Sequence, residues 1–120
     1  MFYFKECNDT YGHLYGDEVL TKVANALVSS FHEDDIVGRF GGDEFVVFMK
    51  HADNSAAQAK VIAYQEVLKT LFLERPVTCS IGIAESRENM DYESLLVNAD
   101  HALYYAKENG RNQYHIYNYK

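Results

Sequence analysis

The chain has 120 residues, which is enough for one small domain spanning residues 1–120. Hydrophobic residues make up 48% and charged residues 24%, as in ordinary globular domains, and 10 Tyr and 7 Phe supply material for a core. The formal net charge of −7 argues against nucleic acid as a partner, because an acidic surface repels polyanions.

The two cysteines, Cys7 and Cys79, are far apart in the sequence and form no CxxC pair. They match neither a zinc site nor a disulfide framework, so the sequence predicts a reducing compartment. No apolar stretch approaches the roughly 20 residues of a membrane span, and no signal peptide is evident. We therefore expect a cytoplasmic chain with no membrane contact of its own, whose parent protein could still be membrane-anchored.

The N-terminal elements are predicted from short local patterns. The aromatic run at residues 1–4 resembles the end of a strand, and residues 8–13 are rich in turn formers. Asp17 and Glu18 are expected in the first turn of a helix, where the positive end of the helix dipole stabilises carboxylates. Apolar residues then recur at helical spacing and should face the core: Leu20, Val23, Ala24, Leu27 and Phe31.

A hairpin follows, with strands at residues 36–40 and 45–49. Gly41 and Gly42 between two apolar runs favour a tight turn, because glycine readily adopts positive φ. The turn holds Asp43 and Glu44 at its tip. Carboxylates bind hard divalent cations, and a backbone without side chains lets amides approach phosphate oxygens. The same four residues could also form nothing more than a polar turn.

The second half predicts a helix from about residue 53 to 72, a strand at 77–84, a helix from about 92 to 109 and an edge strand at 113–119. Gly110 is placed to end the third helix as its C′ residue. The element order indicates an α+β fold, a mostly antiparallel sheet flanked by helices. The stripe expected to be buried on the second helix is Ala56, Ala59, Ala63, Val67 and Leu71.

Several separated motifs together resemble the GGDEF domains of bacterial diguanylate cyclases. They cover nearly the whole chain in the family's order. In chain order they are Phe4-Lys5, Asn8 to His13, Gly16-Asp17, Arg39 to Phe45, Val77 to Ala84, Ala99 to Lys107 and Gly110 to Asn112.

The resemblance implies the palm-like fold of nucleotidyl cyclases and the condensation of two GTP into cyclic di-GMP, with release of two pyrophosphates. Each domain would hold one GTP, so the implied partner is a second GGDEF domain in a homodimer. The implied cofactor is Mg²⁺ or Mn²⁺. A sensory or effector domain is expected elsewhere in a parent protein.

The resemblance also implies roles for individual residues. Asp43 and Glu44 match the catalytic, metal-binding acids, and Gly41 and Gly42 match the glycines whose backbone passes the phosphates. The remaining substrate-binding positions are Asn8 and Asp17 at the guanine, Phe4 and Lys5 in the phosphate-binding loop after the first strand, and Lys107 and Arg111 at the terminal phosphates.

Each of these residues also has a plain structural interpretation. Asn8 could belong to a turn, Asp17 to the first turn of a helix, and Lys107 and Arg111 to a solvated helix C-terminus. Lys107 and Arg111, spaced i and i+4, share a face only if their helix persists to Arg111.

The chain departs from the family pattern at its start. The leading metal-binding aspartate lies eight residues before the position of Asn8 and would be residue zero, and Phe2 takes the place of the second aspartate. We therefore expect an N-terminally incomplete domain with most of the first central strand missing. A fragment, a start assigned at an internal methionine and a shortened domain are the three alternatives. The functional alternatives are a cyclase, an impaired module that binds GTP and regulates a neighbour, and a structural domain.

A second departure concerns the inhibitory product site that many relatives carry. Asp35 matches its aspartate, but His32 occupies the position of its arginine. Neutral histidine cannot make the bidentate contacts of a guanidinium. We therefore expect weak or absent product inhibition through this degenerate site, and submicromolar cyclic di-GMP binding that depends on both residues would contradict it.

Overall fold

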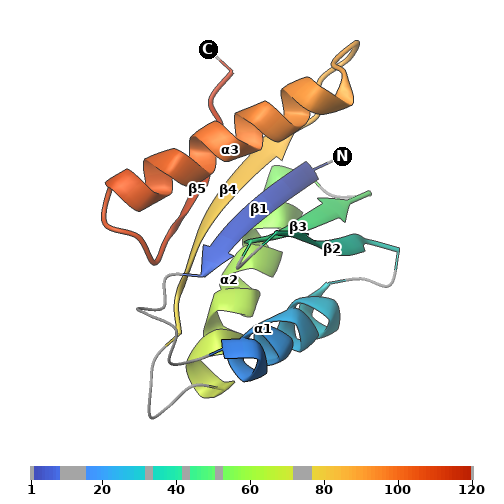
Figure 1. Ribbon diagram of the computed structural model, residues 1–120. Coiled ribbons are helices and arrows are strands. Elements are labelled where there is room, and N and C mark those ends of the chain that lie inside the picture. Colours follow the sequence, from blue (N-terminus) through green and yellow to red (C-terminus); the bar gives the residue numbers. More distant parts are fainter. Residues whose placement is uncertain are drawn as a thin grey trace.

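The computed structural model describes residues 2–8, 16–31, 34–41, 44–50, 53–71 and 77–119. Its helices and strands follow the order predicted from the sequence (Figure 1). They are β1 (Phe2–Asn8), α1 (Gly16–Ser30), β2 (Ile36–Gly41), β3 (Glu44–Met49), α2 (Asn54–Leu71), β4 (Cys79–Glu85), α3 (Tyr92–Glu108) and β5 (Tyr114–Ile116).

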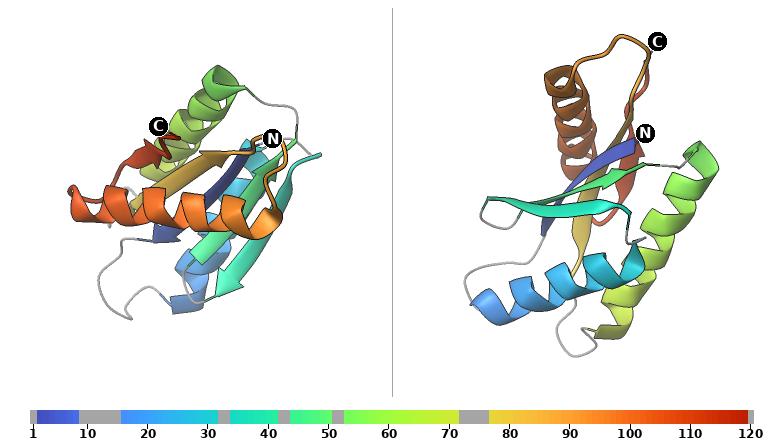
Figure 2. Two further views of the ribbon diagram at one scale, coloured as in Figure 1. Left: turned by 90° about the horizontal axis from the view of Figure 1, so that it is seen from above. Right: turned by 90° about the vertical axis from the view of Figure 1, so that its right-hand side faces the viewer.

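The five strands form one sheet in the order β2-β3-β1-β4-β5. All neighbours pair antiparallel except β4 and β5, which are parallel, so the predicted mostly antiparallel sheet is confirmed. The predicted edge position of the last strand is confirmed too. Helices α1 and α2 cover one face of the sheet and α3 covers the other (Figure 2).

The prediction that most of the central strand is missing is wrong. Strand β1 has seven residues and pairs with β3 on one side and β4 on the other, so the central position of the sheet is filled. Phe2 and Phe4 bury their rings on the face covered by α1 and α2, and Tyr3 buries its ring under α3. Residues after Met1 thus supply both the backbone ladder and the apolar faces that a central strand needs.

Helix α1 buries the predicted stripe, with Val23, Leu27 and the following Phe31 in the core and Leu20 and Ala24 partly buried against it. The stripe predicted for α2 is wrong except at Val67, which packs partly buried against the core. Its three alanines, Ala56, Ala59 and Ala63, are exposed, and Leu71 is 45% exposed. Alanine favours any helical position, so it marks no face by itself. The larger side chains of a neighbouring stripe are buried instead: Ala57, Val61, Tyr64 and Leu68.

Helix α3 begins and ends with recognisable caps. Asp91 accepts a hydrogen bond from the Ser94 amide at 2.7 Å, and this bond lowers the pKa of Asp91. Gly110 has φ +114° after the helix, and the Arg111 amide donates to the Ala106 carbonyl, as in a Schellman motif. Gly110 is therefore the C′ residue that the sequence predicts. Arg111 lies outside the helix, so the condition for its sharing a helical face with Lys107 is not met.

Among the described residues, no helix combines the length and the hydrophobicity that a membrane span requires.

A carboxyl group is buried in the otherwise apolar core between the sheet and α2. Glu6 is fully buried in β1, and the Tyr64 hydroxyl of α2 donates to its Oε2 at 2.7 Å. Burial and the neighbouring Glu6 charge raise the pKa of Tyr64 well above its ordinary value. The pair therefore joins α2 to the central strand by one short hydrogen bond.

We expect Tyr64→Phe to destabilise the domain by about 2 kcal/mol, because it removes a hydrogen-bond donor to a buried carboxyl. Urea unfolding at neutral pH measures the change. Tyr104→Phe is the matched control, since Tyr104 is 65% exposed, and it should leave stability unchanged. Equal stability of the two variants would contradict a structural role for the Tyr64 hydroxyl.

The Tyr64–Glu6 pair also makes the stability of the domain depend on pH in one direction. Tyr64 keeps its proton in the folded chain at a pH where an unfolded tyrosine, with a pKa of about 10, has lost it. The unfolded state then binds fewer protons, so stability should fall as the pH rises above about 10. Tyr64→Phe should weaken this alkaline loss, which urea unfolding at several pH values measures.

Candidate functional site

The end of the sheet where β1 finishes brings together several of the predicted site residues. Cys7 of β1 pairs with Glu44, the first residue of β3, so the hairpin tip lies beside the last residues of β1. Asn8, the last residue of β1, pairs with Cys79 at the start of β4. The C-terminal end of β1, the tip of the β2–β3 hairpin and the start of β4 are therefore neighbours.

Helix α3 runs toward the same end of the sheet. Its Leu95 packs with Tyr3 and Ala84, whereas Leu103, two turns later, lies against Gly82. Since Gly82 pairs with Lys5, α3 follows the direction of β1. The half-buried Lys107 is one turn beyond Leu103, toward the end of the sheet where β1 finishes.

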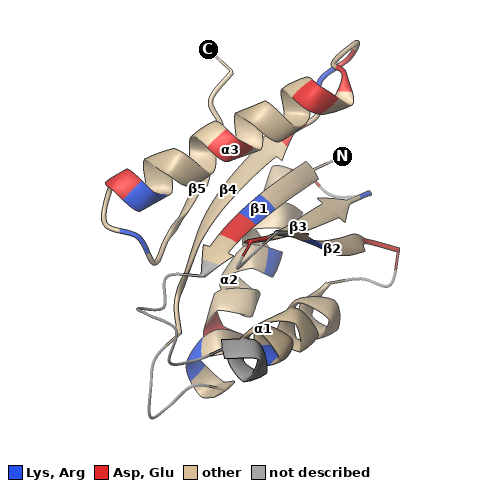
Figure 3. Ribbon diagram, in the orientation of Figure 1, with Lys and Arg blue, Asp and Glu red and all other residues tan. Residues whose placement is uncertain are grey.

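Lys5 is the centre of a charged cluster on the face covered by α3. Its ammonium lies 3.0 Å from Asp100 Oδ1 of α3 and 3.7 Å from Glu44 Oε2 of the hairpin. It also lies 4.7 Å from the centre of the Phe40 ring. The Lys5 side chain is only 12% exposed, so these contacts are partly shielded from water. Figure 3 shows where charged residues lie along α3 and on the strands.

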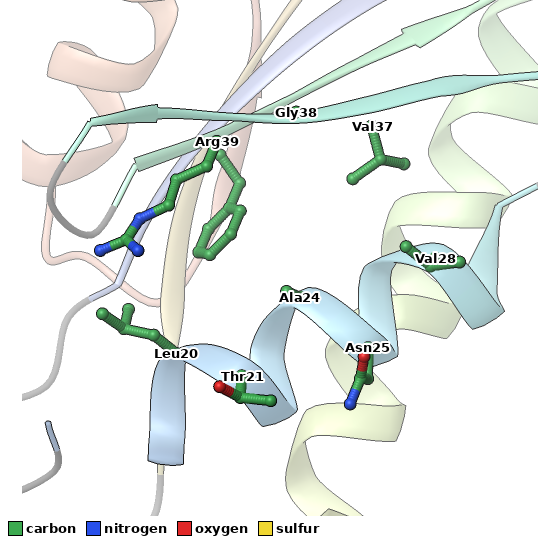
Figure 4. Close-up of a pocket in the computed structure, with 9 residues that line it drawn as sticks. Leu20, Thr21, Ala24, Asn25, Val28, Val37, Gly38 and Arg39 are labelled. Atoms are coloured by element: carbon green, nitrogen blue, oxygen red, sulfur yellow. The ribbon is translucent and has the colours of Figure 1, made fainter. Parts of the chain in front are cut away.

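A groove lies on the opposite face, between α1 and β2, with a volume of about 580 Å³. Arg39 of β2 and Phe45 of β3 are paired across the hairpin, and both line the groove. The two strands therefore form its floor. Figure 4 shows Arg39 and Leu20 at one end and Val28 and Val37 at the other. The lining residues are Leu20, Thr21, Ala24, Asn25, Val28, Val37, Gly38, Arg39 and Phe45.

The groove combines an apolar lining with one strong cation. The partly buried Leu20 and Val37 offer apolar surface to a flat ring, while the Arg39 guanidinium can donate several hydrogen bonds to an anion. Such a combination is suited to a ligand with an aromatic base at one end and negative charge at the other.

Phe4 and Lys5 lie in β1, which corrects the expectation that they form a loop after the first strand. Phe4 is fully buried in the core, and the Lys5 ammonium is turned toward α3. The physical reason is backbone hydrogen bonding. Without this segment between them, β3 and β4 would have unpaired backbone groups on their facing edges.

The structure describes some of the other predicted site residues and not others. Gly41 ends β2 and is paired with Glu44, as a hairpin requires, and Asp17 lies in the first turn of α1. The Lys50 amide lies 3.4 Å from Asp35 Oδ1, its acceptor. Three residues of the predictions lie outside the described part of the chain: His32, Gly42 and Asp43.

Two residues of the site were not predicted from the sequence. Arg39 belongs to the hairpin motif, and its place two residues after Val37 could have indicated that the two share a face. Asp100 meets Lys5 although the two are 95 positions apart. No local pattern reports a contact at that separation.

The described residues include no group of three or more His, Cys, Asp and Glu that could hold a metal ion by itself. Glu44 is one partly exposed carboxylate at the hairpin tip. Mg²⁺ is typically held by one or two carboxylates together with substrate phosphates rather than by a full protein cage. Glu44 with the adjacent Asp43 has the donor chemistry for that mode.

A family model described as "Diguanylate cyclase, GGDEF domain" matches residues 1–113. Cyclic di-GMP phosphodiesterase PdeR of Escherichia coli (strain K12) is 39% identical to this chain over 119 residues, 95% of this chain and 18% of that protein. Diguanylate cyclase DosC of Shigella sonnei is 39% identical over 120 residues, 95% of this chain and 26% of that protein. The chain thus spans about a quarter or less of these two curated relatives.

Solved structures agree with the fold. The GGDEF domain of DgcB from Caulobacter crescentus, in complex with c-di-GMP, superposes with a TM-score of 0.87 at 25% identity. The match covers 96% of this chain and 76% of that one. The overall arrangement of this chain therefore matches that of a solved GGDEF domain.

Proposed function

Because the chain belongs to the GGDEF domain family, we propose that it is a diguanylate cyclase domain that condenses two GTP into cyclic di-GMP and releases two pyrophosphates. The observation that carries this proposal is the groove between α1 and the hairpin, which has an apolar lining and the Arg39 guanidinium. The reaction requires a second GGDEF domain, and the product is a bacterial second messenger.

GTP would bind with its base against the apolar part of the groove and its phosphates toward the hairpin. Leu20 and Val37 would supply apolar contact, and Arg39 would offer donors to a phosphate. Asn8 and Asp17 are proposed to select guanine, since a carboxylate accepts from N1–H and N2–H₂ and an amide can both donate and accept. Their elements support this, because β1 ends and α1 begins on either side of residues 9–15.

The hairpin would supply the acids. Asp43 and Glu44 are proposed to hold Mg²⁺ or Mn²⁺ together with the triphosphate, and the ion would lower the charge on the reacting phosphates. Gly41 and Gly42 carry no side chains, so their backbone would be open to phosphate oxygens. Lys107 and Arg111 are proposed to hold the terminal phosphates, and the direction of α3 supports this for Lys107.

The main contribution of the chain's residues to the chemistry would be to position the two GTP molecules for reaction. Two such domains would face each other so that the 3′-hydroxyl of one GTP lies in line with the α-phosphate of the other. Fixed positive groups at the leaving pyrophosphate need no rearrangement as its charge develops. Neither GTP can be closed into the cyclic product by a single domain, so turnover should rise with protein concentration.

A GTP-binding module that regulates a neighbouring domain is the second candidate. One observation favours it: Phe2 fills a core position where the family pattern has an aspartate, so this chain lacks that carboxylate. The match to a protein named as a phosphodiesterase is compatible with such a role. In this candidate, GTP would bind without being consumed.

The test is incubation of the chain with GTP and Mg²⁺ or Mn²⁺, with products separated by chromatography and GTP binding measured in parallel. Cyclic di-GMP would support the cyclase, and binding without product would support the regulatory module. The absence of both would contradict the two candidates together.

A matched pair of arginine variants connects the assay to the groove. Arg39→Ala should weaken GTP binding about tenfold, because it removes a cation from the phosphates. Arg87→Ala removes an exposed arginine at the turn before α3 and should leave binding unchanged. Equal GTP affinity of the two variants would place the nucleotide elsewhere.

A further inference from the structure

We propose that Asp100 of α3 is a positioning residue for the hairpin acid Glu44, and that it acts through Lys5. It draws the Lys5 ammonium toward α3 and so leaves the Glu44 carboxylate available to a divalent cation. The inference rests on the proposed function only in taking Glu44 as a cation ligand.

The distances indicate how the ammonium is shared. Lys5 Nζ lies 3.0 Å from Asp100 Oδ1 and 3.7 Å from Glu44 Oε2, so the helix acid holds it more closely than the hairpin acid does. Hydrogen bonding of an ammonium to a carboxylate requires about 2.7–3.2 Å, which only the Asp100 contact meets. Lys5 thus hydrogen-bonds Asp100 and contributes only charge at Glu44.

Close packing of α3 on the sheet fixes the backbone position of Asp100. Ala99, the preceding residue, packs its backbone directly over Gly82, and Gly82 is the β4 partner of Lys5. A glycine there lets α3 approach the sheet more closely than any residue with a Cβ would allow. The helix therefore presents Asp100 beside the central strand at the position of Lys5.

The competing arrangement is easy to identify. Without the Asp100 charge, the partly shielded ammonium would have Glu44 as the nearest acid among its described contacts. It would then move toward Glu44 and compete with a divalent cation for the same oxygens. The Phe40 ring, 4.7 Å from the ammonium, lies over the same site and favours a cation remaining there.

The experiment measures Mn²⁺ binding to the chain, alone and with a non-hydrolysable GTP analogue, by electron paramagnetic resonance of the free ion, because one or two carboxylates hold such an ion together with phosphate oxygens. Asp100→Asn should weaken Mn²⁺ binding up to about fivefold, the range expected for a partly exposed ion pair. Asp100→Glu keeps the charge and should restore most of the affinity. Glu93→Gln neutralises an exposed acid on the same helix and should have no effect.

The decisive comparison is made in a Lys5→Met background. If Asp100 acts through Lys5, Asp100→Asn should change nothing once the ammonium is gone. An unchanged affinity in Asp100→Asn alone, or an equal loss with and without Lys5, would overturn the inference. So would Mn²⁺ binding that survives Glu44→Gln, since the ion would then lie elsewhere.

The outcome separates this inference from the proposed function. Mn²⁺ binding that depends on Glu44 and Asp100 in a chain that makes no cyclic di-GMP would contradict the cyclase and leave the positioning role supported. Cyclic di-GMP formation by a chain whose Mn²⁺ affinity does not change in Asp100→Asn would support the cyclase and contradict the positioning role.

Discussion

Gly82→Ala should destabilise the domain by about 3 kcal/mol, the upper end of the usual cost of overpacking a core. A Cβ at this position would lie 2.2 Å from the Ala99 carbonyl oxygen and 2.2 Å from the Leu103 nitrogen. Both are backbone atoms of α3, so no side-chain rotation can relieve the contact. The helix would have to move away from β4 and lose packing along its buried face, which urea unfolding would report.

Gly38 provides the matched control. A Cβ there would meet only the Val46 side chain, at an ordinary contact distance of 3.6 Å. Gly38→Ala should therefore change stability by less than about 1 kcal/mol, even though both glycines lie within strands. Equal destabilisation of the two variants would mean that strand propensity, and not the approach of α3, governs position 82.

Asp43→Ala should lower GTP turnover at least about a hundredfold if the chain is a cyclase, the loss typical of removing one preorganised electrostatic group. The proposed role of the acid is to hold a cation at the phosphates, which alanine cannot do. Chromatography of cyclic di-GMP at saturating GTP and Mg²⁺ measures the change.

Glu88→Ala, which removes an exposed acid from the turn before α3, controls for net charge and should retain full turnover. GTP binding should persist in Asp43→Ala, because the groove residues are untouched. Normal product formation by Asp43→Ala would refute the assignment of the hairpin as the metal-binding element.

Much of the fold could be predicted because its signals are local. The hairpin follows from two glycines between apolar runs, and the end of α3 from Gly110. Only the end of the central strand was predicted, at residues 1–4, because the family resemblance implied a loop from Phe4 onward and the apolar run stops at the charged Lys5 and Glu6. Their burial is tolerated only through partners on other elements, Asp100 and Tyr64, which no window of sequence contains.

The site was predictable to a smaller degree than the fold. Family resemblance supplied Lys5 and Glu44 as site residues, and the structure added Arg39 on the opposite face of the sheet. The groove with Arg39 lies toward α1, and the cluster of Glu44 and Lys5 lies toward α3. Which face a hairpin residue occupies depends on strand register, and β2 changes register between Arg39 and Gly41, where simple alternation fails.

The position of β1 has a consequence for how the chain folds. Strand β1 is the middle one of the sheet and precedes its four neighbours in the chain. Its partner β4 comes much later, with Phe2 opposite Glu85 and Asn8 opposite Cys79. Pairing over such sequence separations is entropically costly and slows folding. During synthesis β1 must wait for most of the domain to emerge, and until it docks, the edges of β3 and β4 stay open to other chains.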